Sequence, residues 1–135
     1  MATVTVVGAG MMGTAICTPL LDNGHAVRLV GTHLDGAAVA ALQKDRRHPG
    51  LEYAMGEGLT AFSVDALGPA VAAAEVVVLG VSSPGVRWAA QHVGPHLRPG
   101  VPIISVTKGF EWDGVELRIL PDVLASALPE GLCAP

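Results

Sequence analysis

Three glycines near the amino terminus have the spacing of a diphosphate-binding turn. They are Gly8, Gly10 and Gly13, in the run GAGMMG, and an apolar run precedes them. In such a turn the first glycine allows a tight bend, the second lets a pyrophosphate approach the backbone, and the third lets the next helix pack closely on the strand. The free N–H groups at the start of that helix attract the anion. We therefore predict a dinucleotide site from Gly8 to Gly13, and the alternative is a turn with a structural role only.

The residues that sense the adenosine ribose are expected about 20 positions after the glycines. Here the sequence reads GTHLD, from Gly31 to Asp35. A carboxylate at the end of the second strand would select NAD, but Asp35 comes slightly late and is expected mainly to cap the next helix. Thr32 and His33 can accept a 2′-phosphate, with Arg46 or Arg47 reaching in. Both NAD and NADP are therefore compatible with the sequence.

Lys108 is one of only two lysines, and it follows the apolar run from Ile103 to Val106. In a parallel sheet, ligands bind outside the carboxyl ends of the strands, so we expect Lys108 at the same edge as Gly10 and Ser82. A lysine there can hold an anionic group of a substrate or bond to a reacting oxygen. The alternative is a solvated lysine beside a turn glycine. Ser82 and Ser83 have no base nearby in the sequence, so helix capping and cofactor contact are expected of them.

Short β-branched runs alternate with stretches rich in alanine and leucine. Strands that are apolar throughout and separated by helices predict a parallel sheet covered on both faces. The predicted fold is therefore α/β, a Rossmann-type doubly wound parallel sheet in one domain that spans residues 1–135. The predicted strands are 4–7, 26–30, 60–63, 75–81 and 101–107. The predicted helices are 11–21, 35–44, 84–97 and 115–128, with a loop at 46–58 and the start of a sixth strand at 132–135.

Composition narrows the classes of function. The net charge is −4, which argues against nonspecific binding of nucleic acid. No signal peptide and no apolar stretch of membrane-spanning length is visible, so the cytoplasm is the expected location. Cys17 and Cys133 are expected as free thiols rather than a disulfide. His92 and His96 lie on one predicted helix with no third ligand in view, so no metal site is predicted. Trp88 and Trp112 are expected in packing or at an interface.

Together these motifs resemble the amino-terminal domain of NAD(P)-dependent glycerol-3-phosphate dehydrogenase. The resemblance runs through nearly the whole chain, and the block TKGFE is its most specific part. It implies reversible reduction of dihydroxyacetone phosphate to sn-glycerol 3-phosphate by NAD(P)H. It also implies that Lys108 contacts both substrate and cofactor, and that Met11, Met12 and Thr32 contact the nucleotide. The matching residues are Gly8-Ala9-Gly10 with Gly13-Thr14-Ala15, Asn23-Gly24-His25, Asp45-Arg46, Ser82-Ser83 and residues 107–111.

The sequence departs from this family at several positions. Met11 and Met12 replace a serine or asparagine followed by an aromatic residue, and no aromatic residue follows Ser83 closely. The alternatives are another dehydrogenase of the β-hydroxyacid or ketopantoate reductase type, or a dinucleotide sensor without catalysis.

The resemblance also implies a carboxy-terminal helical domain that supplies a second lysine. We therefore expect this chain to bind the cofactor without turnover. The full-length protein is expected to be a homodimer that acts on a small phosphorylated substrate. Neither nucleic acid nor a membrane is expected as a partner.

Overall fold

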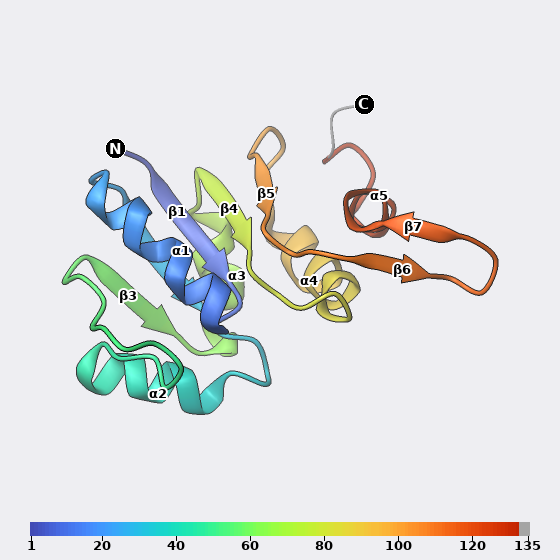
Figure 1. Ribbon diagram of the computed structural model, residues 1–135. Coiled ribbons are helices and arrows are strands. Elements are labelled where there is room, and N and C mark those ends of the chain that lie inside the picture. Colours follow the sequence, from blue (N-terminus) through green and yellow to red (C-terminus); the bar gives the residue numbers. More distant parts are fainter. Residues whose placement is uncertain (133–135) are drawn as a thin grey trace.

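The centre of the protein is a five-stranded parallel sheet in the order β3-β2-β1-β4-β5, seen in a computed structural model that describes residues 1–132 (Figure 1). The strand order reverses direction between β1 and β4, which places a crevice at the carboxyl ends of these two strands. This topology confirms the predicted Rossmann-type fold. The strands are β1 (Thr3–Val7), β2 (Ala26–Val30), β3 (Leu59–Phe62), β4 (Val76–Leu79) and β5 (Ile103–Ser105).

Helices cover both faces of the sheet because the strand residues alternate between two cores (Figure 1). On one face, Val4 and Val6 of β1 pack with residues of α1 and α2. On the other face, Val7 packs with residues of α3, α4 and α5. All three valines are almost fully buried. The helices are α1 (Met11–Asp22), α2 (Gly36–Asp45), α3 (Leu67–Ala72), α4 (Gly85–Val93) and α5 (Leu120–Ala127), with short 3-10 turns at η1 (Val64–Ala66) and η2 (Gly94–His96).

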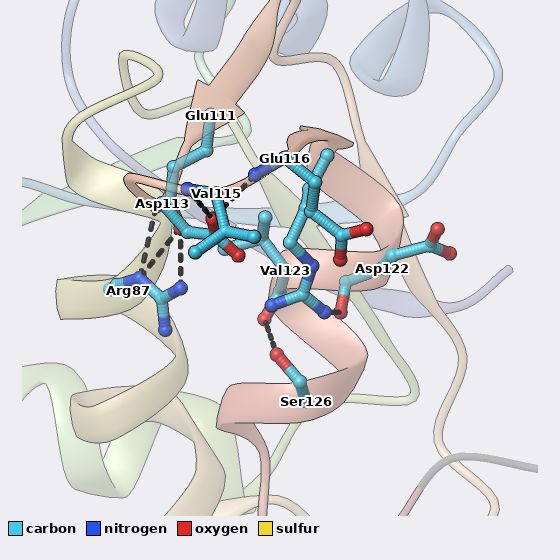
Figure 2. Close-up of polar contacts among 9 residues, drawn as sticks. Arg87, Glu111, Asp113, Val115, Glu116, Asp122, Val123 and Ser126 are labelled. Atoms are coloured by element: carbon cyan, nitrogen blue, oxygen red, sulfur yellow. Dashed lines mark hydrogen bonds and ion pairs between the residues drawn. The ribbon is translucent and has the colours of Figure 1, made fainter.

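The prediction of a helix from residue 115 to 128 was wrong in its first part. An antiparallel hairpin, β6 (Phe110–Trp112) and β7 (Leu117–Ile119), occupies this region, and α5 begins only at Leu120. The cause lies in the turn, where Asp113 Oδ1 accepts hydrogen bonds from the N–H groups of Val115 at 2.8 Å and Glu116 at 2.9 Å (Figure 2). These two bonds lower the pKa of Asp113. An Asp-Gly pair is a strong hairpin signal, and Gly114 has the positive φ of 98° that such a turn favours.

A short helical segment between β3 and β4 was not predicted. Residues 64–72 form η1 and α3, which are too short to show a clear helical period in the sequence. The helix covers the sheet, and its Ala70 carbonyl accepts a 2.8 Å hydrogen bond from the buried hydroxyl of Thr5. Within residues 1–132, no helix combines the length and the apolar character that crossing a membrane requires.

Cys17 lies on the buried face of α1 and should be unreactive in the folded protein. Its side chain is fully buried and its thiol donates to the Gly13 carbonyl at 3.3 Å. Burial raises the pKa of this thiol to about 12, so at pH 8 the thiolate, which is the reactive form, is almost absent. Cys133 lies outside the described residues, so Cys133→Ser should be used to isolate Cys17. In that variant a disulfide reagent at pH 8 should modify the thiol only after urea is added, and rapid modification without urea would contradict the burial.

Candidate functional site

The glycine turn joins β1 to α1, and its backbone contacts at Gly8 and Gly13 leave no room for a side chain. Gly8 has a φ of 107°, and a Cβ atom there would lie 2.7 Å from the Gly80 carbonyl oxygen. A Cβ atom on Gly13 would lie 2.0 Å from the Gly8 carbonyl oxygen. The helix therefore packs directly on the strand end, as predicted for the first and third glycines. Gly80, which follows β4, is a fourth member that the sequence analysis missed, since its own Cβ would lie 2.6 Å from Gly13 Cα.

Gly10 differs from its neighbours because it faces open space. Apart from Gly10 itself and its two chain neighbours, no atom of the described part of the chain would lie within 4 Å of a Cβ atom built there. Gly10 is the N-cap of α1, a helix of 12 residues, and its carbonyl accepts the first helical hydrogen bond from Thr14 at 2.9 Å. The first turn of α1 carries no acidic side chain. The free N–H groups and the positive end of α1 are thus accessible to an anion.

A cavity of about 350 Å³ lies beside this turn, which is within the range of small-molecule sites. It opens between the segment after β2 and the start of α4, at the carboxyl ends of β1, β2 and β4. The structure thus brings together predicted residues from three parts of the chain. Those that line the cavity are Gly8, Gly10, Thr32, His33 and Ser82. The other lining residues are Leu34, Asp35, Gly80, Val81, Pro84, Gly85 and Trp88.

Asp35 is the N-cap residue of α2, as expected, but its side chain makes no capping hydrogen bond to the helix. Its Oδ2 atom accepts hydrogen bonds from the N–H groups of Thr32 at 2.8 Å and Ala9 at 3.0 Å. The carboxylate therefore ties the segment after β2 to the glycine turn and stands in the wall of the cavity. Asp35 reaches this position because the chain folds back after β2, where the Asp35 N–H donates to the Thr32 carbonyl at 3.1 Å.

An aromatic group that the sequence analysis assigned to packing also faces the cavity. Trp88 of α4 lines it and contacts His33 across it, with ring centroids 5.3 Å apart. The indole also stacks on His92, with ring centroids 4.5 Å apart and an angle of 21° between the ring planes. His92 donates from Nδ1 to the Trp88 carbonyl at 2.8 Å, which fixes its ring. The spacing of Trp88 and His92, one helical turn apart, was the available signal for this aromatic wall.

The block TKGFE is fastened to the segment that follows β4. The expectation that Ser83 caps α4 with its side chain was wrong. Its hydroxyl donates instead to the Lys108 carbonyl at 2.9 Å. The Thr107 hydroxyl donates to the Val81 carbonyl at 2.7 Å. These bonds place Lys108 beside the end of β4, where its side chain is exposed and lies outside the cavity lining.

An ion pair continues this attachment. Arg87 of α4 and Glu111 of β6 bond through two guanidinium nitrogens and both carboxylate oxygens (Figure 2). The bond to Glu111 is the main cause that raises the pKa of Arg87. A paired Arg–carboxylate contact of this kind fixes geometry as well as charge. The glutamate at the end of the block therefore holds the hairpin against α4.

The remaining predicted residues lie around the turn rather than in the cavity wall. Met11 and Met12 are half-exposed at the start of α1, with 57% and 51% of their surface accessible. Ala9 is fully buried. Among residues 1–132, no three side chains of His, Cys, Asp or Glu gather as a metal site would require.

The chain matches the family model described as NAD-dependent glycerol-3-phosphate dehydrogenase N-terminus, over residues 3–134. It is 37% identical over 107 residues to the NADP(+)-dependent glycerol-3-phosphate dehydrogenase of Archaeoglobus fulgidus, covering 79% of this chain and 31% of that protein. It is 37% identical over 116 residues to a glycerol-3-phosphate dehydrogenase [NAD(P)+] of Saccharophagus degradans, covering 83% and 31%. The crystal structure of glycerol-3-phosphate dehydrogenase from Coxiella burnetii superposes with a TM-score of 0.81 at 24% identity, covering 94% of this chain and 38% of that one.

The chain thus spans about a third of the length of the relatives it matches. The solved structure supports the fold, and the family model, which covers nearly every residue, supports the membership. The motifs from which the resemblance was inferred lie inside the matched range. The chain belongs to the family of amino-terminal domains of NAD-dependent glycerol-3-phosphate dehydrogenase.

Proposed function

We propose that this chain is the cofactor-binding part of an enzyme that interconverts dihydroxyacetone phosphate and sn-glycerol 3-phosphate with NAD(P)H. The observation that carries the proposal is the open N-terminus of α1 at Gly10, beside a cavity of about 350 Å³, in a chain of this family. The names of the relatives include both NADP(+)-dependent and NAD(P)+ enzymes, so either dinucleotide is proposed as the cofactor.

In this proposal each part of the site has one task. The turn from Gly8 to Gly13, with Met11 and Met12, holds the pyrophosphate through backbone N–H groups. Thr32 and His33 contact the adenosine ribose, and Ser82 and Ser83 contact the cofactor from the segment after β4. The bound cofactor supplies the hydride. Lys108, exposed at the end of β5, binds the substrate by charge and hydrogen bonding and also contacts the cofactor.

Asp35 bears on the choice between the two cofactors. Its carboxylate stands in the cavity wall, where a negative charge disfavours a 2′-phosphate and suits a ribose hydroxyl. His33, which lines the same cavity, can donate to a 2′-phosphate. Because these two side chains act in opposite directions, we propose a modest difference in affinity between NADH and NADPH.

Tryptophan fluorescence should report cofactor binding at the cavity. Trp88 lines the cavity, whereas Trp112 is 64% exposed on β6, so Trp112→Phe leaves one indole at the site. We expect oxidised cofactor, which does not absorb where tryptophan emits, to quench this variant by contact with the indole. In Trp88→Phe, the matched control, the remaining emission should change little. Quenching of Trp112 alone would place the bound nucleotide elsewhere.

Turnover tests the proposal as a whole. The complete protein should reduce dihydroxyacetone phosphate with NAD(P)H, whereas the 135-residue chain should bind the cofactor without turnover, because we propose that a second lysine and most phosphate contacts come from a following domain. Binding without turnover by the complete protein, across a panel of phosphorylated ketones, would favour a sensor. Reduction by the 135-residue chain at the rate of the complete protein would overturn the division of roles.

A further inference from the structure

Both polar backbone groups of Ala9, at the centre of the glycine turn, are hydrogen-bonded by side chains. Its N–H donates to Asp35 Oδ2 at 3.0 Å, and its carbonyl oxygen lies 3.0 Å from His48 Nε2. Ala9 is fully buried, and only 8% of His48 is exposed. His48 lies between α2 and β3, outside the glycine motif and outside every residue predicted for the site. His48 is therefore a buried side chain in direct contact with the turn that no predicted role explains.

The hydrogen bonds around His48 determine which nitrogen carries the proton. The Gly50 N–H donates to His48 Nδ1 at 2.9 Å, so Nδ1 acts as the acceptor. A neutral imidazole with an accepting Nδ1 carries its hydrogen on Nε2. The Ala9 carbonyl can only accept, so the network assigns the direction: His48 Nε2–H donates to the Ala9 carbonyl oxygen. One ring nitrogen thus orders its own loop and the other holds the turn.

The segment that carries His48 is itself fixed to the body of the domain. Arg47 and Ala54 form a bridge, and the Met55 N–H donates to the Arg46 carbonyl at 2.8 Å. Gly50 packs on Met11, so closely that a Cβ atom on Gly50 would lie 3.0 Å from Met11 Cγ. His48 is therefore a rigid support rather than a side chain on a free loop.

We propose that His48 is a positioning residue of the dinucleotide site, which orients the peptide group between Ala9 and Gly10 so that the N–H groups of the turn meet the pyrophosphate. This inference rests on the proposed function. The Ala9 carbonyl and the Gly10 N–H belong to one planar peptide group, so rotation of that group would turn the backbone that the anion approaches. A turn held in its binding conformation before the ligand arrives spares the cost of ordering it on binding, and this raises affinity.

Two substitutions separate this role from simple support of the loop. In His48→Gln the amide nitrogen takes the place of Nε2 and can donate to Ala9, while the bond from Gly50 is lost. In His48→Asn the amide oxygen takes the place of Nδ1 and keeps the bond from Gly50, while the shorter side chain loses Ala9. Each variant gives up one hydrogen bond, so similar losses of thermal stability are expected.

Titration calorimetry with NADH and NADPH is the first measurement. We expect His48→Gln to bind within about threefold of the parent and His48→Asn to bind about tenfold more weakly. Equal affinities in the two variants, or the reverse order, would overturn the proposal, because any change in cofactor affinity would then come from the order of the loop or from the stability of the domain.

Amide exchange of Ala9 in the ligand-free protein is the second measurement, and it does not depend on the cofactor. The buried N–H of Ala9 bonds to Asp35, so its exchange requires the turn to open. Without the bond from His48 the turn should open more often, so exchange should be at least about tenfold faster in His48→Asn than in the parent and near the parental rate in His48→Gln. Unchanged exchange in His48→Asn would overturn the role of His48. If the parent bound neither cofactor, the proposed function would fail, and the exchange rates would still decide whether His48 holds the turn.

Discussion

Replacing Gly10 by valine is expected to abolish measurable cofactor binding while the domain stays folded. The new side chain would enter the open space at the N-terminus of α1, where the pyrophosphate is proposed to lie. The backbone of Gly10, with φ −73°, is one that valine can adopt, so no strain is added. Loss of the diphosphate contacts should weaken binding by at least about 100-fold, roughly 2.7 kcal/mol, in a calorimetric titration with NADPH.

A matched control is available in Gly36, the first residue of α2. Apart from its chain neighbours and the backbone of its own helix, a Cβ atom there also meets nothing within 4 Å in the described part of the chain. Gly36 lies outside the cavity lining. Gly36→Val should therefore bind as the parent does. Gly13→Val, by contrast, should fail to fold normally, because its Cβ would lie 2.0 Å from the Gly8 carbonyl oxygen. Parental affinity in Gly10→Val would show that the diphosphate binds elsewhere.

Replacing Lys108 by alanine in the complete enzyme is expected to lower kcat/KM at least about 100-fold, which corresponds to roughly 2.7 kcal/mol of transition-state stabilisation. The fold should be unaffected, because the Lys108 side chain is exposed and the bond that fixes this residue is made by its backbone carbonyl to Ser83. A circular-dichroism melt at the parental temperature would verify that the variant is folded.

Two further variants define what Lys108 contributes. Lys44→Ala removes the other lysine, which lies in the last turn of α2, and should leave turnover unchanged. Lys108→Arg keeps the charge but changes the shape and the donor geometry, so it should restore only part of the activity. Near-normal kcat/KM in Lys108→Ala would return this residue to the role of a solvated lysine beside a turn.

The other residues of the block TKGFE explain why Lys108 stands where it does. Thr107, the Lys108 carbonyl and Glu111 each bond to the segment between the end of β4 and the middle of α4, through Val81, Ser83 and Arg87. The backbone on both sides of Lys108 is therefore tied to one wall of the cavity. The block works as an attachment for the lysine, which accounts for its polar residues beyond the lysine itself.

The sequence by itself determined the sheet, the glycine turn and the position of Lys108 at a strand end. These features follow from local patterns: apolar β-branched runs predict buried parallel strands, and glycine spacing predicts the turn. The hairpin after Phe110 was also encoded locally, in Asp113 and Gly114, but the apolar residues around it resembled a helix.

Only the tertiary structure decided what the polar side chains at the site do. Asp35 bonds to Ala9 across 26 positions, His48 to Ala9 across 39, and Ser83 to Lys108 across 25. For Asp35 and Ser83 the sequence favoured a local use, which was to cap a helix, and it assigned no role to His48. The long-range bonds form beside the local ones because the strand order brings the ends of β1, β2 and β4 together, and a buried backbone group must be hydrogen-bonded by whatever side chain reaches it.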